Sequence, residues 1–112
     1  MTLTPVQKRA ITEVRTYFGS PEFKKRVALG LPVRSGEVYG TSRAGGVTPA
    51  LLDRDAAQAF VADRDTEAIT YVVVCDATPV LWVRGRDLVV PELRDDMLKQ
   101  LRVQRRVLAF LT

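Results

Sequence analysis

The sequence predicts an α+β fold in a single domain of residues 1–112. It has N-terminal helices, a small antiparallel β-meander over about residues 69–90, and a long amphipathic C-terminal helix. Three observations predict this order: helix-start signals near the N-terminus, a β-branched run in the middle, and a basic amphipathic pattern at the end. The 112 residues are 46% hydrophobic and 27% charged, which is a globular composition. That length suits one domain with its own core.

Two consecutive helices are predicted at the N-terminus, over residues 5–18 and 21–29. Each begins with a hydroxyl residue followed by proline, which is typical of the first turn of a helix. Apolar residues then recur at helical spacing, and a glycine follows each segment. The pattern therefore predicts two short amphipathic helices in series.

Between these helices and the strands, the sequence indicates a short hairpin, a loop and one further helix. Valines flank a Ser-Gly pair at residues 35–36, a pattern typical of a tight hairpin. Glycine and hydroxyl residues dominate residues 40–46, which indicates a loop. An aspartate at position 53 or 55 can cap the helix that we expect over residues 56–63.

The clearest β signal is Ile69–Cys75, which is rich in β-branched and aromatic residues and apolar on both faces. Such a strand is expected to be covered on both sides, by helices or by a second subunit. Turn residues at 76–79 and 85–86 separate two further predicted strands, 80–83 and 87–90. The expected meander has three strands.

Pro91 is expected to begin the final helix, which runs to about Leu111. The predicted apolar stripe consists of Leu93, Met97, Leu101, Leu108 and Leu111. The opposite side carries the basic residues Lys99, Arg102, Arg105 and Arg106. Acidic residues near the beginning and basic residues toward the end suit the helix dipole.

The composition excludes several kinds of catalytic chemistry. The chain has no His and one Cys, so it cannot form a Ser-His-Asp triad, a Cys-His nucleophile or a His/Cys zinc set. The alternating carboxylates of residues 63–67 lack the glycine and the final glutamate of a calcium loop. We therefore expect a non-enzymatic protein with no catalytic residue, no metal and no cofactor.

The single cysteine and the hydropathy pattern also bear on location. Cys75 cannot form an intramolecular disulfide, which fits a reducing cytoplasm, and its apolar strand predicts a small core residue. No apolar run approaches the ~20 residues that span a bilayer. We expect a cytoplasmic protein that does not bind membranes.

The segment Tyr71–Val83, followed by Val89-Val90-Pro91, resembles a small family of uncharacterised actinobacteriophage proteins. The centre of that family reads approximately Tyr-Val-Val-Tyr-Ser-Tyr-x-Thr-Pro-Ile-Ala-Trp, and its specific Thr-Pro-x-x-Trp core is present here. The loop of residues 42–46 also resembles an Arg- and Gly-bearing loop of the family. The chain departs from it at Cys75-Asp76, and where a helix replaces a Tyr-Ser-x-Thr-Thr-Ser-x-His-Gln segment. The resemblance implies a phage or prophage origin and a β-meander, and no activity.

One functional hypothesis is a small phage- or prophage-derived protein that acts by binding a host protein. Its candidate partner-binding residues are Arg43, in a loop that could also cradle an anion, and Trp82. Trp82 has core packing as its alternative role. The doubly apolar strand and the final helix leave surplus apolar surface, which predicts a homodimer.

The alternative hypothesis is a basic nucleic-acid-binding regulator that uses the C-terminal helix. The chain has a net charge of +4, and Lys99, Arg102, Arg105 and Arg106 could follow a phosphate backbone. The same residues could equally form a solvated helix face. Lys and Arg of the first helices would extend the patch if the terminal helices were neighbours. A ribonuclease working without His is a third reading, but no constellation of residues supports it.

Overall fold

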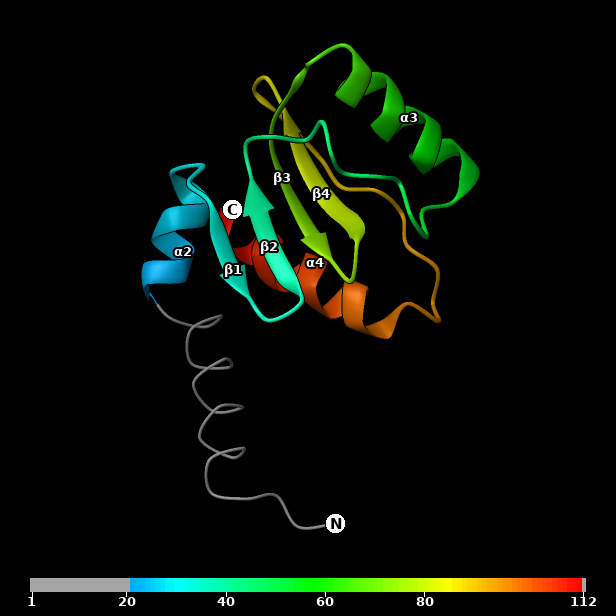
Figure 1. The fold of residues 1–112 in the computed structure, drawn as a ribbon. Helices are drawn as coiled ribbons and strands as arrows, with labels where there is room; N and C mark the ends of the chain where they lie inside the picture. Colours follow the sequence, from blue (N-terminus) through cyan, green and yellow to red (C-terminus); the bar gives the residue numbers. More distant parts are fainter. Residues whose placement is uncertain (1–20, 112) are drawn as a thin grey trace.

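The elements follow the predicted α+β order in a computed structural model that describes residues 21–111 (Figure 1). They are α2 (Pro21–Ala28), β1 (Val33–Ser35), β2 (Val38–Thr41), α3 (Arg54–Asp65), β3 (Ile69–Cys75), β4 (Thr78–Arg84), β5 (Asp87–Val89) and α4 (Leu98–Leu111). The fold class is therefore confirmed, with the C-terminal helix after the strands. The helix predicted over residues 5–18 lies outside the described residues.

The sheet has five antiparallel strands in the order β1-β2-β3-β4-β5. The predicted three-stranded meander is correct for β3, β4 and β5 but incomplete. The hairpin of β1 and β2 joins it, with pairs running from Val38↔Cys75 to Thr41↔Val72. The sequence patterns that locate the hairpin are local, whereas α3 and two connections separate β2 from β3, so these patterns do not predict this pairing.

The turn between β3 and β4 is shorter than predicted. Asp76 and Ala77 have positive φ values of 49° and 65°, as in the two-residue turns that suit the twist of a hairpin. Thr78 and Pro79, which were expected in the turn, already belong to β4. A proline at this position cannot donate a ladder hydrogen bond, and the β3–β4 register shifts beside it.

Helices of this chain cover both faces of the sheet (Figure 1). On one face, Phe60 of α3 packs edge-on against Trp82 of β4, with ring centroids 5.1 Å apart. On the other face, α4 packs against β3 and β4 and also against α2, where Phe110 meets Phe23. The expectation that Ile69–Cys75 is covered on both sides is confirmed. Because α3 and α4 provide the cover, this strand does not require a second subunit, and the homodimer stays a prediction.

Helix α4 differs from its prediction in both its beginning and its buried face. It begins at Leu98, and residues 90–97 form a non-helical connection. Its buried residues are Gln100, Val103, Gln104 and Val107, whereas Leu101, Leu108 and Leu111 of the predicted stripe are only partly buried. Gln104 is drawn into the core by hydrogen bonds to backbone oxygens of Val80 and Pro91. A hydropathy pattern assigns glutamine to the surface, so the predicted buried face of the helix was wrong. Leu93 and Met97 of the predicted stripe are buried, but both precede the helix.

The end of α2 has the backbone pattern of a Schellman cap. Gly30 has φ 68°, its N–H donates to Val27 O, and the N–H of Leu31 donates to Arg26 O. The chain then enters β1 in a fixed direction. None of the helices within residues 21–111 is long and apolar enough to cross a membrane.

Tyr71 fixes the β1–β2 hairpin from the side of the sheet that faces α2. Its hydroxyl donates a hydrogen bond of 2.9 Å to Leu31 O, and its ring crosses β2 at Gly40. A Cβ on Gly40 would collide with the Tyr71 hydroxyl. Glycine at this position therefore permits the close approach that holds the hairpin against the end of α2.

Candidate functional site

A groove of about 580 Å³ lies along the β1–β2 hairpin and the loop that follows it. We call it the arginine groove and define it by the polar and aromatic residues that line it: Arg26, Arg34, Tyr39, Thr41 and Arg43. Pro32, Gly46 and Val47 complete part of its wall. The groove thus combines three cations with one aromatic ring.

The three arginines come from three separate elements. Arg26 belongs to α2, Arg34 to β1, and Arg43 to the loop after β2. No Asp or Glu lines the groove, and none of the three guanidinium groups forms an ion pair with a carboxylate in the described part of the chain. The wall of the groove therefore carries positive charge with no carboxylate in it, which favours an anionic ligand. The nearest carboxylates lie outside the groove, where Glu22 lines a neighbouring pocket with Arg26, and Asp65 and Glu67 line another with Arg43.

The capped end of α2 positions Arg26. Its Nε donates a hydrogen bond of 3.1 Å to Pro32 O, and its own carbonyl accepts the N–H of Leu31. Both bonds connect α2 to the entrance of β1. The Arg26 side chain is consequently held at one wall of the groove.

The hairpin register positions Arg34 beside Tyr39. The two residues are direct cross-strand partners, and the guanidinium carbon of Arg34 lies over the Tyr39 ring, 5.1 Å from its centroid. This distance is within the range of a cation–π contact. Tyr39 also pairs with Val74 of β3, so its backbone is held between two neighbouring strands.

Arg43 follows the end of β2 in a local turn. Its backbone N–H donates to Thr41 Oγ1 at 3.0 Å, a side-chain turn that orients the start of the loop. The Arg43 side chain is exposed and reaches the groove. The sequence-based suggestion that this loop could meet an anion is thus compatible with its position.

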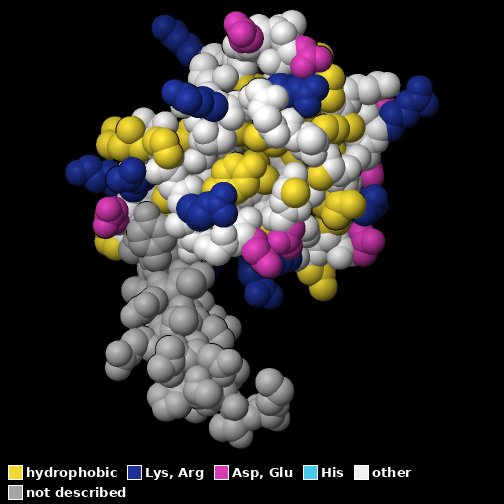
Figure 2. Space-filling view, viewed as in Figure 1, with side chains coloured by type: hydrophobic (Ala, Val, Ile, Leu, Met, Phe, Trp, Pro, Cys, Tyr) yellow, Lys and Arg dark blue, Asp and Glu magenta, His cyan; other side chains and the backbone are white. Residues whose placement is uncertain are grey.

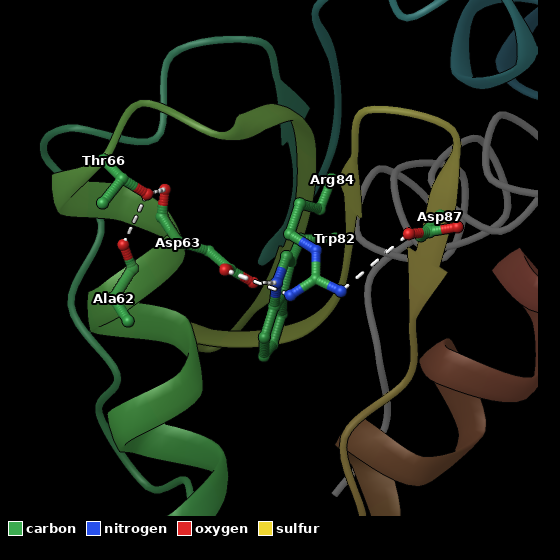
Figure 3. A network of polar contacts seen from close by, with 6 residues as sticks. All are labelled: Ala62, Asp63, Thr66, Trp82, Arg84 and Asp87. Carbon is green, nitrogen blue, oxygen red and sulfur yellow. Dashed lines mark hydrogen bonds and ion pairs between the residues drawn. The ribbon is translucent and has the colours of Figure 1, made fainter.

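Trp82, the second predicted partner-binding residue, lies in the core with no exposed surface. Its Nε1 donates a hydrogen bond of 2.9 Å to Asp63 Oδ2 (Figure 3). Arg84 Nη1 lies 3.5 Å from Asp63 Oδ1 and Arg84 Nη2 lies 3.9 Å from Asp87 Oδ2, so the network runs outward from Trp82 to the surface. The role as an exposed anchor is therefore wrong, and the alternative role in core packing is correct.

The basic residues of α4 lie on the other side of the sheet from Arg34 and Tyr39. Lys99 forms ion pairs with Glu37 and with Asp76, the latter at 3.2 Å, and so ties α4 to two hairpin turns. Arg102, Arg105 and Arg106 are exposed. The structure does not bring this helix face together with the arginine groove.

The terminal helices of the described region are neighbours, which the sequence left open. Phe23 and Phe110 pack edge-on at 6.2 Å, and Lys24 Nζ lies 5.2 Å from the centroid of the Phe110 ring. On the face seen in Figure 2, Lys and Arg side chains are scattered around hydrophobic surface and do not form a continuous basic band. On this face the distribution fits a local site.

Cys75 offers no reactive thiol. Its side chain is fully buried, and burial, together with the charge of Asp76, raises the pKa of the thiol to about 11. Within residues 21–111 no group of His, Cys, Asp and Glu is arranged to hold a metal ion.

The local sequence patterns predict Arg43 as a groove residue but do not predict Arg34 and Tyr39 as its partners. The signal that could have found them is the hairpin itself. Once Ser35 and Val38 are paired across the turn, Arg34 must lie opposite Tyr39. Arg26 had no such local signal, because its place depends on how α2 packs beside β1.

No family model, curated protein or solved structure matches this chain. The candidate site consequently rests on the geometry described above.

Proposed function

We propose that this protein is a non-enzymatic binding protein whose arginine groove binds the phosphate groups of a nucleic acid. One observation supports this most strongly: Arg26, Arg34 and Arg43 converge from three elements on a groove that no carboxylate lines. A guanidinium group presents planar, paired donors that match phosphate oxygens. Several such groups in one groove suit a ligand with repeated phosphates.

The proposal changes the location of the nucleic-acid site relative to the sequence-based hypothesis. Lys99 is occupied by Glu37 and Asp76, which removes one of the four cations assigned to the C-terminal helix. The groove residues have no such carboxylate partners within the described region. We therefore assign the phosphate contacts to the groove, and we regard the exposed arginines of α4 as a solvated face.

A host protein with an acidic segment is the competing partner. Carboxylates also accept paired hydrogen bonds from arginine, so charge alone does not separate the two ligands. The predicted phage or prophage origin agrees with either partner. The test must consequently compare a nucleic acid with an acidic peptide directly.

The decisive experiment compares two double variants that remove the same charge. Arg34→Gln/Arg43→Gln changes the groove, and Arg102→Gln/Arg105→Gln changes the exposed face of α4. Binding of a labelled oligonucleotide is measured by fluorescence anisotropy over a series of salt concentrations. We expect the groove variant to bind roughly tenfold or more weakly and the slope of log K against log salt to fall by about two. The α4 variant should remain within about twofold of the unmodified protein.

Three outcomes would contradict the proposal. Equal losses in the two double variants would show that only net charge matters, and a loss confined to the α4 variant would return the site to the C-terminal helix. Tight binding of a polyglutamate peptide with no binding of the oligonucleotide would instead identify an acidic protein as the partner. Thermal unfolding by circular dichroism verifies that both variants are folded.

A further inference from the structure

Tyr39 and Arg34 form an aromatic and guanidinium pair on the sheet surface within the arginine groove. The Tyr39 ring is partly exposed, and the exposed Arg34 guanidinium lies over it at 5.1 Å. Both residues sit on hydrogen-bonded strands, β1 and β2, rather than on the loop. Their backbone positions are therefore fixed before any ligand arrives.

Resting on the function proposed above, we infer that the nucleic acid is single-stranded and that an unpaired base stacks on the Tyr39–Arg34 pair. Tyrosine rings and arginine guanidinium planes are both surfaces on which unpaired bases stack. Part of Tyr39 packs against the core, and a phosphate would use only the charge of Arg34 and not the exposed part of the Tyr39 ring. The combination of the two in one groove points to a ligand with both phosphates and bases.

The remaining arginines fit the backbone of such a strand. Arg26 and Arg43 line the same groove as the stacking pair and come from α2 and the loop after β2. A base on the Tyr39–Arg34 pair would leave its flanking phosphates within the same positively charged groove. In a duplex the bases are paired and stacked inside, so only the phosphate contacts remain. The groove consequently selects a single strand over a duplex.

The test uses three forms of one short oligonucleotide: the single strand, the same strand with abasic sites in place of its bases, and the duplex. All three supply phosphates, but only the first supplies free bases. We expect the unmodified full-length protein to bind the base-bearing strand at least about fivefold more tightly than the abasic strand or the duplex, because stacking contributes about that much or more per base.

Variants of the pair assign this preference to the proposed surface. Tyr39→Leu removes the aromatic ring and should reduce the preference for bases to less than about twofold, while its affinity for the abasic strand stays unchanged. Tyr39→Phe keeps the ring and serves as the matched control. Arg34→Lys keeps the charge but loses the planar surface, so it should lower affinity for the base-bearing strand more than affinity for the abasic strand. If Tyr39→Leu does not fold, the Arg34→Lys variant alone tests the stacking surface.

The outcomes separate this inference from the function on which it rests. Equal binding of all three oligonucleotides, with the loss in Arg34→Gln/Arg43→Gln retained, would overturn base stacking and leave phosphate binding in the groove intact. A preference for the single strand that survives in both Tyr39→Leu and Arg34→Lys would place the stacking surface elsewhere and also overturn the inference. Failure of every oligonucleotide to bind would overturn both proposals together.

Discussion

The side-chain amide of Gln104 in α4 donates a hydrogen bond of 2.8 Å to the backbone oxygen of Val80 in β4. Val80 lies where the β3–β4 register shifts, since Val73 pairs with Leu81 and Val74 pairs with Pro79. The same amide donates a second bond of 2.8 Å to Pro91 O. One buried glutamine thus satisfies two backbone acceptors and joins the helix, the bulge and the connection before α4.

Replacing Gln104 by Leu should destabilise the protein markedly. The substitution leaves two carbonyl oxygens without their buried donor, and an unsatisfied buried polar group costs about 1–3 kcal/mol. We expect the free energy of unfolding in urea to fall by at least that amount. Gln58→Leu, at an exposed position of α3, is the matched control and should change it by less than about 0.5 kcal/mol. Similar losses at both positions would refute the structural role of Gln104.

The hydrogen bond between Trp82 and Asp63 predicts a second stability effect. Asp63→Ala leaves the buried indole N–H without an acceptor, so the free energy of unfolding should fall by about 1–3 kcal/mol. The loss of unfolding free energy caused by Asp63→Ala should be smaller in a Trp82→Phe background, where no indole N–H remains. The unmodified protein, the two single variants and the double variant form a double-mutant cycle, and chemical unfolding followed by circular dichroism measures all four proteins. Asp65→Ala, which breaks only an exposed ion pair with Arg64, should cost less than about 1 kcal/mol.

Gly40 is predicted to tolerate no side chain. Gly40→Ala introduces a methyl group where the Tyr71 hydroxyl lies, and such overpacking costs about 1–3 kcal/mol. Gly45→Ala is the control, because a Cβ there meets no atom within 4 Å. Thermal unfolding should therefore separate the two variants clearly. If Gly40→Ala melted at the same temperature as Gly45→Ala, the close approach of Tyr71 to β2 would be incorrect.

Stability should decline in alkali because of Tyr71. Burial raises the pKa of Tyr71 from 10.0 to about 12, with the charge of Arg26 opposing the rise. The folded state therefore holds a proton that the unfolded state releases. The resulting stabilisation is complete below pH 10 and is lost as the pH rises toward 12. Unfolding free energies measured across this interval should fall more steeply for the unmodified protein than for Tyr71→Phe, and equal slopes would contradict the assigned pKa.

Cys75 should cause a second loss of stability in alkali, which begins at a lower pH than the loss caused by Tyr71. Burial and Asp76 raise the pKa of its thiol from 9.0 to about 11, so stabilisation from the neutral thiol is lost between these values. The Tyr71 comparison is consequently made in a Cys75→Ala background. In the unmodified protein, alkylation of the thiol at pH 8 should be slow in the native state and fast in denaturant. Rapid alkylation of native protein would contradict the burial of Cys75.

The sequence by itself determined the features that depend on neighbouring residues. Proline at the start of α2, the glycine after it and the β-branched run of β3 are local signals, and each element lies where they predict. Helix α3 spans Arg54–Asp65, two residues longer at each end than the predicted 56–63. Hydropathy also predicted correctly that β3 is covered on both faces and that the arginines of α4 are exposed. Of the candidate site, these local patterns identified Arg43 alone.

Only the tertiary structure decided how distant segments meet. Pairing of β2 with β3 brings the hairpin into the sheet across the long connection that contains α3. Two long-range hydrogen bonds from Gln104 draw a polar residue into the buried face of α4. The groove likewise requires α2, β1 and the loop after β2 to pack side by side. Such contacts depend on the complementarity of surfaces far apart in the chain, and periodicity and capping signals extend over only a few residues.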